Sequence, residues 1–216
     1  MILLFLGAGA LGQLFASYIA KQHPDYLIYL FTSKKYRESI KEHGIILQTI
    51  ENKGDIIKNL KLGSELDIFL FDKNKEELHV FVTSKVYSNE EIVFQYRDYI
   101  EKASSLVILQ NGIGNEEIFI KQFPDLPIYR MSTANGALII KEGVVRHTGK
   151  GITYLGGIAN TIESHLQFYY ELINSSGLPI IISKNIEKII WEKLLVNVCI
   201  NAIGALTKNK NGTILK

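Results

Sequence analysis

The chain has 216 residues, of which 47% are hydrophobic, and its formal net charge is +2. This length allows one sizeable domain and part of a second, and this hydrophobic content excludes an intrinsically disordered chain. The near-neutral charge gives no reason to expect a nucleic-acid partner or a strongly acidic one. The single cysteine, Cys199, cannot form an intramolecular disulfide, which fits a reducing cytoplasm.

The apolar start of the chain does not have the pattern of a targeting segment. "MILLFLGAGALG" has no basic region before it, and glycines interrupt it after Leu6, so we expect no signal peptide. We also find no apolar run of about 18 residues without a polar break, so we expect no membrane span. The sequence therefore predicts a soluble, cytoplasmic protein.

The first 33 residues have the pattern of a βαβ unit. "MILLFL" is a short, continuously apolar run, which is typical of a buried strand in a parallel sheet. A glycine-rich turn follows, then the helical pattern "QLFASYIAKQ" and a second strand, "YLIYLFTS".

The rest of the chain continues the alternation of strands and helices. Two further parallel strands, "ELHVFVTSK" and "SSLVILQNG", flank a predicted helix, "NEEIVFQYRDYIEKA". We expect a small strand pair within residues 45–75 and antiparallel strands appended to the sheet over residues 127–157. A long apolar helix begins near Ile186. The predicted fold class is α/β: a Rossmann-type dinucleotide-binding domain, residues 1–184, followed by the start of an all-helical second domain, residues 185–216.

The turn after the first strand carries a phosphate-binding pattern. Gly7, Gly9 and Gly12 form G-x-G-x-x-G between a strand and a helix, where glycines allow a tight turn and close approach of the backbone to a pyrophosphate. The alternative is a glycine turn with a structural role only. The expected cofactor-binding residues here are Gly7, Ala8, Gly9, Ala10, Leu11 and Gly12.

The end of the second strand indicates which dinucleotide is bound. An NAD site usually has an acidic residue here to bind the ribose 2′-hydroxyl, and "FTSKKYR" has none. Thr32, Ser33 and Lys34, with Lys35 and Arg37 behind them, suit a 2′-phosphate instead. A solvated basic turn is the alternative, and we expect NADP(H).

Polar residues follow two of the later strands. Lys85 and Asn111 both fall at carboxyl ends of predicted strands, where open α/β sheets bind ligands. Alternatively, Lys85 is a surface lysine and Asn111 is part of a turn. We interpret Asn115 as a helix cap, and the acids Glu116 and Glu117 after it as structural.

The long apolar helix carries a narrow polar stripe. Lys193, Asn197 and Asn201 are spaced four apart and span about 80° of the helix surface. A desolvated lysine has a lowered pKa and can give a proton to the alkoxide that forms when hydride reaches a ketone. The two amides could orient the substrate. The alternative is an exposed polar face.

Taken together, these segments resemble the ketopantoate reductase (2-dehydropantoate 2-reductase) family. The matching pieces are "GAGALG", "TSK", "LQNGIGNEE" and "WEKLLVNVCINAIGALT", in that order. The resemblance implies NADPH-dependent reduction of a 2-oxo acid to a 2-hydroxy acid on the route to pantothenate and coenzyme A.

The resemblance also implies roles for individual residues. Lys193 would be the general acid, Asn111 would lie at the nicotinamide and the substrate, and Lys85 would lie near the cofactor. Asn197 and Asn201 would contact the substrate, and no metal takes part. Family members are longer, and a late serine and glutamate complete their substrate site. The chain is therefore expected to be a fragment, a truncated gene product or a natural short relative of the family. We expect this 216-residue form to bind NADPH, to reduce ketopantoate poorly or not at all, and either to self-associate as a homo-oligomer or to be a piece of a longer polypeptide.

Two rival functions stay open. β-Hydroxyacid dehydrogenases also place a K-x-x-x-N pair on a helix that begins a second domain, although "QNG" argues against them. A nucleotide-binding module without catalysis is the other rival. The sequence does not select among branched 2-oxo acid substrates.

Overall fold

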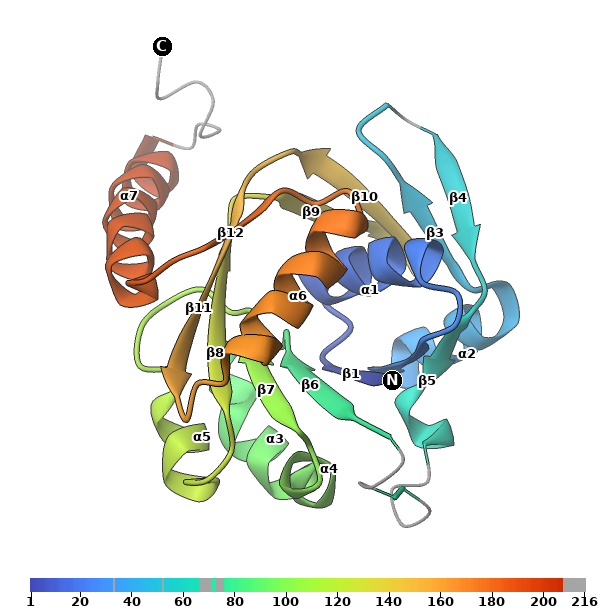
Figure 1. Cartoon of the computed structure of the whole chain (residues 1–216). Coiled ribbons are helices and arrows are strands. Elements are labelled where there is room, and N and C mark those ends of the chain that lie inside the picture. Colours follow the sequence, from blue (N-terminus) through green and yellow to red (C-terminus); the bar gives the residue numbers. More distant parts are fainter. Residues whose placement is uncertain (33, 52, 67–70, 73–75, 208–216) are drawn as a thin grey trace.

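A computed structural model describes residues 1–32, 34–51, 53–66, 71–72 and 76–207 (Figure 1). Its main sheet has eight strands in the order β12-β11-β8-β7-β6-β1-β2-β5. The strands are β1 (Ile2–Leu6), β2 (Leu27–Phe31), β5 (Leu60–Leu62), β6 (Leu78–Val82), β7 (Ser105–Ile108), β8 (Ile128–Thr133), β11 (Thr153–Ala159) and β12 (Ile180–Ile182). The six strands from β5 to β8 are parallel, and β11 runs antiparallel to β8.

The central strand β1 explains how the sheet is covered on both faces. All five of its residues are buried, and successive side chains point to opposite faces. Leu3 and Phe5 join the core beneath α1 (Ala10–Gln22) and α6 (Glu163–Ser175). Leu4 and its alternate neighbours join a second core beneath α3 (Asn89–Gln95), α4 (Arg97–Glu101) and α5 (Glu117–Gln122). The continuously apolar run "MILLFL" is therefore a strand covered on both sides, as predicted.

The helix predicted from "NEEIVFQYRDYIEKA" is wrong in one respect, because it is two helices. Tyr96 ends α3 and precedes α4, with backbone angles of φ −115° and ψ 23° that lie outside the helical region. Its ring packs against Phe31 with 4.5 Å between ring centroids. With this break, Ile92 and Val93 of α3 and Ile100 of α4 are all buried in the core on this face of the sheet.

A second sheet of four strands lies beside the first, in the order β4-β3-β10-β9. Its strands are β3 (Ile45–Gln48), β4 (Gly54–Ile57), β9 (Gly136–Lys141) and β10 (Val144–Gly149), and α2 (Lys34–His43) precedes it in the chain. The strand pair predicted within residues 45–75 is confirmed by β3 and β4.

The prediction of antiparallel strands appended to the main sheet over residues 127–157 is partly wrong. β8 pairs parallel to β7, and β9 and β10 belong to the second sheet. Only β11 joins the main sheet antiparallel, against β8. The physical reason is α1, whose apolar side chains pack between the two sheets and provide both with a core.

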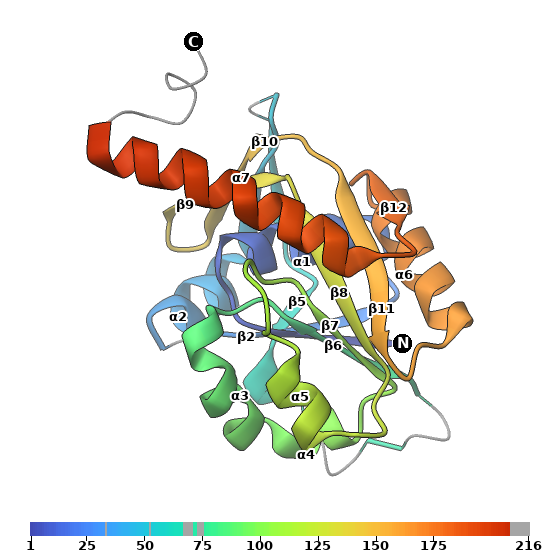
Figure 2. The same cartoon turned by 90° about the vertical axis from the view of Figure 1, so that its left-hand side faces the viewer.

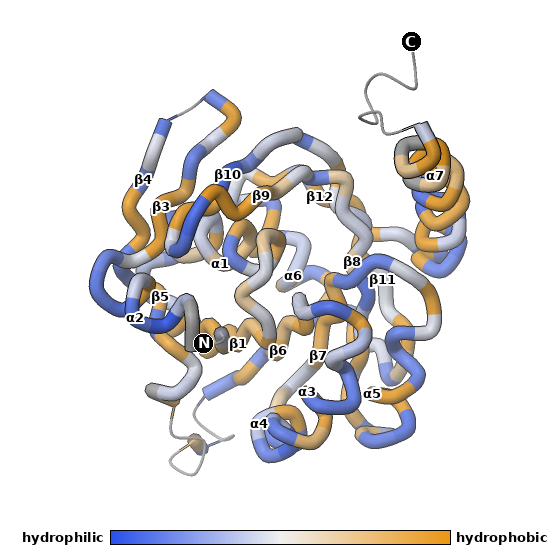
Figure 3. Tube along the Cα trace, turned by 180° about the vertical axis from the view of Figure 1, so that it is seen from behind, coloured by the Kyte–Doolittle hydropathy of each residue, from blue (hydrophilic) through white to orange (hydrophobic). Residues whose placement is uncertain are grey.

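The last described element is the long helix α7 (Ile186–Thr207), which packs against β8 and β11 at the edge of the main sheet (Figures 1 and 2). Figure 3 shows that apolar residues make up much of α7. By length and composition α7 could cross a membrane, a property that it shares with core helices of soluble proteins. It is the one such helix within the described residues.

Candidate active site

The turn between β1 and α1 needs glycine at two of its three glycine positions. Gly7 has a φ of +121°, and a Cβ there would lie 2.5 Å from the backbone nitrogen of Ser84. A Cβ on Gly12 would overlap the carbonyl oxygen of Gly7 and lie 2.6 Å from Thr83 Oγ1. The Thr83 hydroxyl donates a 2.6 Å hydrogen bond to that same carbonyl. These two glycines therefore fix the packing of the turn.

Gly9 differs, because the space beside it is open. A Cβ on Gly9 would meet only the carbonyl oxygen of Thr83, at 3.7 Å. Gly9 is the N-cap of α1 without a side-chain cap, and the first turn of α1 contains no acidic residue. Unpaired N–H groups and the positive end of the helix dipole make such an N-terminus favourable for an anion. The turn therefore fits a pyrophosphate group approaching at Gly9.

A continuous cleft passes the glycine turn. One section extends from Thr32 and Arg37 to the glycine turn, and the next extends from Gly9 to Asn111. The residues that line both sections are Gly9, Ser84, Lys85, Tyr87 and Ser88. Of the sequence-predicted turn residues, Gly7, Ala8 and Gly9 line the first section, and Ala10 and Leu11 line the second.

The basic turn after β2 forms one end of this cleft. Thr32 lines it, and its buried Oγ1 has no hydrogen-bond partner among the described residues. Arg37 also lines the cleft and donates a 3.3 Å hydrogen bond from Nε to the carbonyl oxygen of Thr32. Ser33 and the side chains of Lys34 and Lys35 lie outside the described part of the chain. The described groups at this end suit an anionic or hydroxyl ligand.

Lys85 lies midway along the cleft. It is exposed, lines both sections and directly precedes a 3₁₀ turn, Val86–Ser88. Lys85 is therefore a surface lysine that lines the cleft, and its contact with a cofactor stays a prediction.

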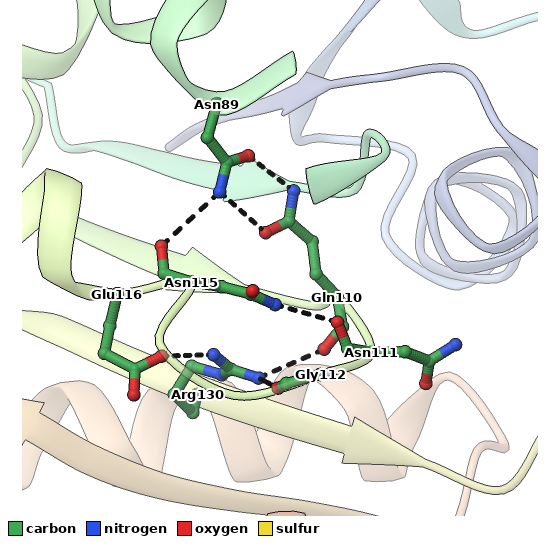
Figure 4. A network of polar contacts seen from close by, with 7 residues as sticks. All are labelled: Asn89, Gln110, Asn111, Gly112, Asn115, Glu116 and Arg130. Atoms are coloured by element: carbon green, nitrogen blue, oxygen red, sulfur yellow. Dashed lines mark hydrogen bonds and ion pairs between the residues drawn. The ribbon is translucent and has the colours of Figure 1, made fainter. Parts of the chain in front are cut away.

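Asn111 lies at the other end, in a loop held by side chains behind it. Gln110 exchanges two hydrogen bonds with Asn89 of α3, of 2.7 and 3.2 Å, and also bonds to the carbonyl oxygen of Ser84 at 3.1 Å. The loop is therefore tied to the segment that carries Lys85. Figure 4 shows the Asn111 side chain pointing away from this network.

The interpretation of Asn115 as a helix cap is wrong. The N-cap of α5 is Glu116, which makes no side-chain cap hydrogen bond. Asn115 is buried, and its amide donates a 2.8 Å hydrogen bond to the carbonyl oxygen of Asn111. Gly112 and Gly114, with φ of +95° and +73°, turn the chain between them so that Asn115 closes the loop. Glu116 pairs with the guanidinium of Arg130.

The polar stripe of α7 faces the body of the protein at this end of the cleft. Lys193 and Asn197 line one small pocket together with Asn111. The pocket also contains Gln110, Gly112, Ser132, Ile190 and Leu194. The side chain of Asn201 lies outside what the structure describes. An exposed polar face, the alternative for this stripe, is wrong for Lys193 and Asn197, because outward positions such as Leu195 and Val198 are apolar instead.

The ammonium group of Lys193 is held in a partly buried position. Its Nζ donates a 2.6 Å hydrogen bond to the carbonyl oxygen of Thr133, at the end of β8. Burial, and secondarily the positive charge of Arg130, lower the pKa of Lys193 below its ordinary value. The lysine is therefore both oriented and easier to deprotonate than one in water.

Arg130 is the main residue at this site that the sequence reasoning missed. It is fully buried in β8, a strand in which all six residues are buried. The available signal was a charged residue within the apolar stretch "PIYRMST", because a buried charge needs a specific partner.

The glycine turn, the parallel sheet and the cleft at its carboxyl edge define a Rossmann-type dinucleotide-binding protein. Comparison with known proteins agrees with this class and identifies the family. The family described as "Ketopantoate reductase PanE/ApbA" matches residues 3–160, and its C-terminal counterpart matches residues 185–216. The chain belongs to the ketopantoate reductase PanE/ApbA family.

Individual relatives are similar over nearly the whole chain. The 2-dehydropantoate 2-reductase of Pyrococcus abyssi is 34% identical over 99% of this chain and 67% of the relative. The solved structure of 2-dehydropantoate 2-reductase from Geobacter metallireducens is similar with a TM-score of 0.81 and 22% identity, over 96% of this chain and 66% of that one.

A ternary structure of D-mandelate dehydrogenase with NADH and anilino(oxo)acetate has a TM-score of 0.82 and 24% identity, over 96% of this chain and 65% of that one. These two structural likenesses describe the fold. This chain spans about two thirds of the length of the relatives that it matches.

Proposed function

We propose that the protein reduces ketopantoate, or a similar 2-oxo acid, to the 2-hydroxy acid with NADPH as the hydride donor. The observation that supports this proposal most strongly is the pocket that Asn111, Lys193 and Asn197 line together. This pocket lies at one end of the cleft, which passes the glycine turn and has Thr32 and Arg37 at its other end. Family membership and the names of the curated relatives support the substrate class.

Several residues would hold the cofactor along the cleft. Gly9 and the first turn of α1 would receive the pyrophosphate, and Lys85 would lie beside it. Arg37 and Thr32 would bind the 2′-phosphate, with Lys34 adding positive charge. The absence of an acidic residue at the end of β2 supports NADP(H) over NAD(H). Asn111 would then lie at the nicotinamide end.

Lys193 would act as the general acid. When bound, NADPH supplies a hydride to the ketone carbon, and negative charge develops on the ketone oxygen. A Lys193 ammonium whose pKa is lowered by burial gives up its proton more readily than an ordinary lysine. The hydrogen bond to Thr133 keeps its Nζ oriented at the pocket. Asn197 would donate or accept a hydrogen bond with the substrate carboxylate or hydroxyl, and Asn201 would extend this contact.

Several wider expectations belong to the same proposal. The reaction would serve pantothenate biosynthesis in the cytoplasm, and the protein would act as a homo-oligomer. Residues 1–184 would form the cofactor domain, and the segment from residue 185 would begin the second domain. The match of the C-terminal family segment to residues 185–216 supports this division.

The test is consumption of NADPH by the purified chain with ketopantoate and a panel of other 2-oxo acids. We expect NADPH oxidation above the substrate-free rate, and we expect it to be greatest with a branched 2-oxo acid. A second candidate is a nucleotide-binding module without catalysis. Saturable NADPH binding without oxidation by any 2-oxo acid would support that candidate and contradict the first.

A further inference from the structure

Arg130 is fully buried beside the loop that carries Asn111, and its guanidinium contacts that loop directly. Its Nη2 donates hydrogen bonds of 3.1 and 2.9 Å to the carbonyl oxygens of Gln110 and Gly112 (Figure 4). These two residues flank Asn111 on either side. Its Nη1 pairs with the carboxylate of Glu116. Both terminal nitrogens of the guanidinium are thus committed within the protein.

The carbonyl oxygens of three consecutive loop residues, Gln110, Asn111 and Gly112, therefore all accept hydrogen bonds from buried side chains. Asn115 bonds the carbonyl oxygen of Asn111 at 2.8 Å, between the two that Arg130 holds. A buried guanidinium needs its hydrogen bonds and its counter-charge, so the loop, Arg130 and Glu116 stabilise one arrangement together. That arrangement leaves the Asn111 side chain pointing away from the network.

Arg130 is also part of the electrostatic surroundings of Lys193. β8 carries both Arg130 and Thr133, and Thr133 accepts the Lys193 hydrogen bond. The other titratable groups on the strands that α7 packs against are Tyr129 of β8 and Tyr154 of β11. On α7 itself, the charged residues in the turns around Lys193 are Glu187, Lys188 and Glu192.

We propose that Arg130 and Glu116 form a positioning pair, which orients Asn111 and sets the charge around Lys193. This inference rests on the proposed function, in which Lys193 is the general acid and Asn111 contacts the cofactor. Both roles require a fixed orientation of the side chain or a set charge environment. The two members carry opposite charges: Arg130 disfavours the charged form of Lys193, and the carboxylate of Glu116, which pairs with Arg130, should counter that effect.

The opposed signs provide a test that a purely structural pair would fail. The probe is trace acetylation of the full chain with acetic anhydride, followed by mass spectrometry of the Lys193 peptide as a function of pH. Arg130→Met removes the positive charge and should slow labelling of Lys193 at fixed pH by about threefold to tenfold. Glu116→Gln leaves the Arg130 charge uncompensated and should speed labelling of Lys193, by a smaller factor. The double variant should label Lys193 faster than Arg130→Met alone, because it lacks the negative charge of Glu116.

Labelling of Lys188, which is 69% exposed at its side chain on the same helix, provides the internal control. Equal labelling of Lys193 in folded native and Glu116→Gln proteins, or changes of the same sign in both single variants, would overturn the proposal. Should Arg130→Met not fold, Glu116→Gln alone decides, because it keeps the shape and size of the side chain. Absence of 2-oxo acid reduction in the native chain would contradict the proposed function and would leave this titration unchanged.

Discussion

The Nζ of Lys193 lies 2.6 Å from the carbonyl oxygen of Thr133, so a charged hydrogen bond joins α7 to strand β8 of the main sheet. This contact places the ammonium group in the pocket that Asn111 and Asn197 also line. Lys193, although it belongs to an apolar helix, is therefore part of the site at the end of the cleft.

Replacing Lys193 should separate chemistry from cofactor binding. Lys193→Met removes the proton donor, and we expect turnover with ketopantoate to fall by roughly 10²–10⁴-fold. NADPH affinity should stay within about twofold, because the glycine turn lies at a different part of the cleft. Lys188→Met is the matched control, since Lys188 is an exposed lysine on the same helix. An equal loss of turnover in both variants would argue against the assigned role.

Arg37 should govern the preference for NADPH over NADH. The native chain should bind NADPH more tightly than NADH. Arg37→Ala should lower the ratio of the two affinities by about fivefold to tenfold, because it removes a charged contact to the 2′-phosphate. Lys41→Ala, in the last turn of the same helix, is the control. Fluorescence titration with both cofactors measures the difference. Equal affinities in the native chain would rule out the basic turn as a 2′-phosphate site.

Two glycines of the turn should respond differently to alanine. A Cβ on Gly9 meets no atom closer than 3.7 Å, so Gly9→Ala should fold normally and yet weaken NADPH binding by at least about tenfold. A Cβ on Gly12 overlaps Gly7, so Gly12→Ala should lower the free energy of unfolding by about 1–3 kcal/mol. Urea unfolding and cofactor titration measure the two effects. Unchanged NADPH affinity in Gly9→Ala would mean that no pyrophosphate approaches there.

Stability should fall as the solution becomes acidic, because of buried histidines. Burial lowers the pKa of His79 to about 3, while the unfolded chain has a value near 6.5. Between these values the unfolded state binds more protons, so the free energy of unfolding rises with pH by about 1.4 kcal/mol per unit from this group. The contribution of His79 to the free energy of unfolding is fully present above pH 6.5 and is lost as pH falls toward 3.

His79→Gln should flatten that dependence by about one proton, as measured by urea unfolding between pH 4 and 7. His147 and His165 also have lowered pKa values through burial, so part of the native slope should persist. His43→Gln is the control, because the His43 side chain is 65% exposed. The same slope in the native and His79→Gln proteins would show that His79 is not neutral in the folded state.

The outward face of α7 should promote self-association of the 216-residue chain. Its exposed apolar residues are Trp191, Leu195, Val196, Val198, Ile203 and Leu206. Covering each contributes about 1.5–3 kcal/mol, so a double change of Leu195→Glu and Val198→Glu should weaken association on the order of 100-fold. Ile56→Glu is the control, because Ile56 is equally exposed on β4. Sedimentation of the native chain as a stable 24.4 kDa monomer would contradict this expectation.

Local pattern predicted most of the main sheet, because its strands are short apolar runs and its glycine turn is a specific signal. The β3–β4 strand pair was predicted, but its union with β9 and β10 in a second sheet was not, since that union depends on α1 packing against strands that are distant in sequence. The polar stripe located Lys193 and Asn197, because four-residue spacing defines one helix face. Arg130 was missed, because its significance arises from contacts with a loop 18 to 20 residues earlier.

The most direct test of the account follows the hydride itself. The purified chain would be incubated with ketopantoate and NADPH that carries deuterium at both C4 positions, and the organic acid product would be analysed by mass spectrometry. We predict pantoate one mass unit heavier than the unlabelled acid, formed mole for mole with oxidised cofactor. Pantoate without deuterium, or no pantoate despite saturating NADPH, would contradict it.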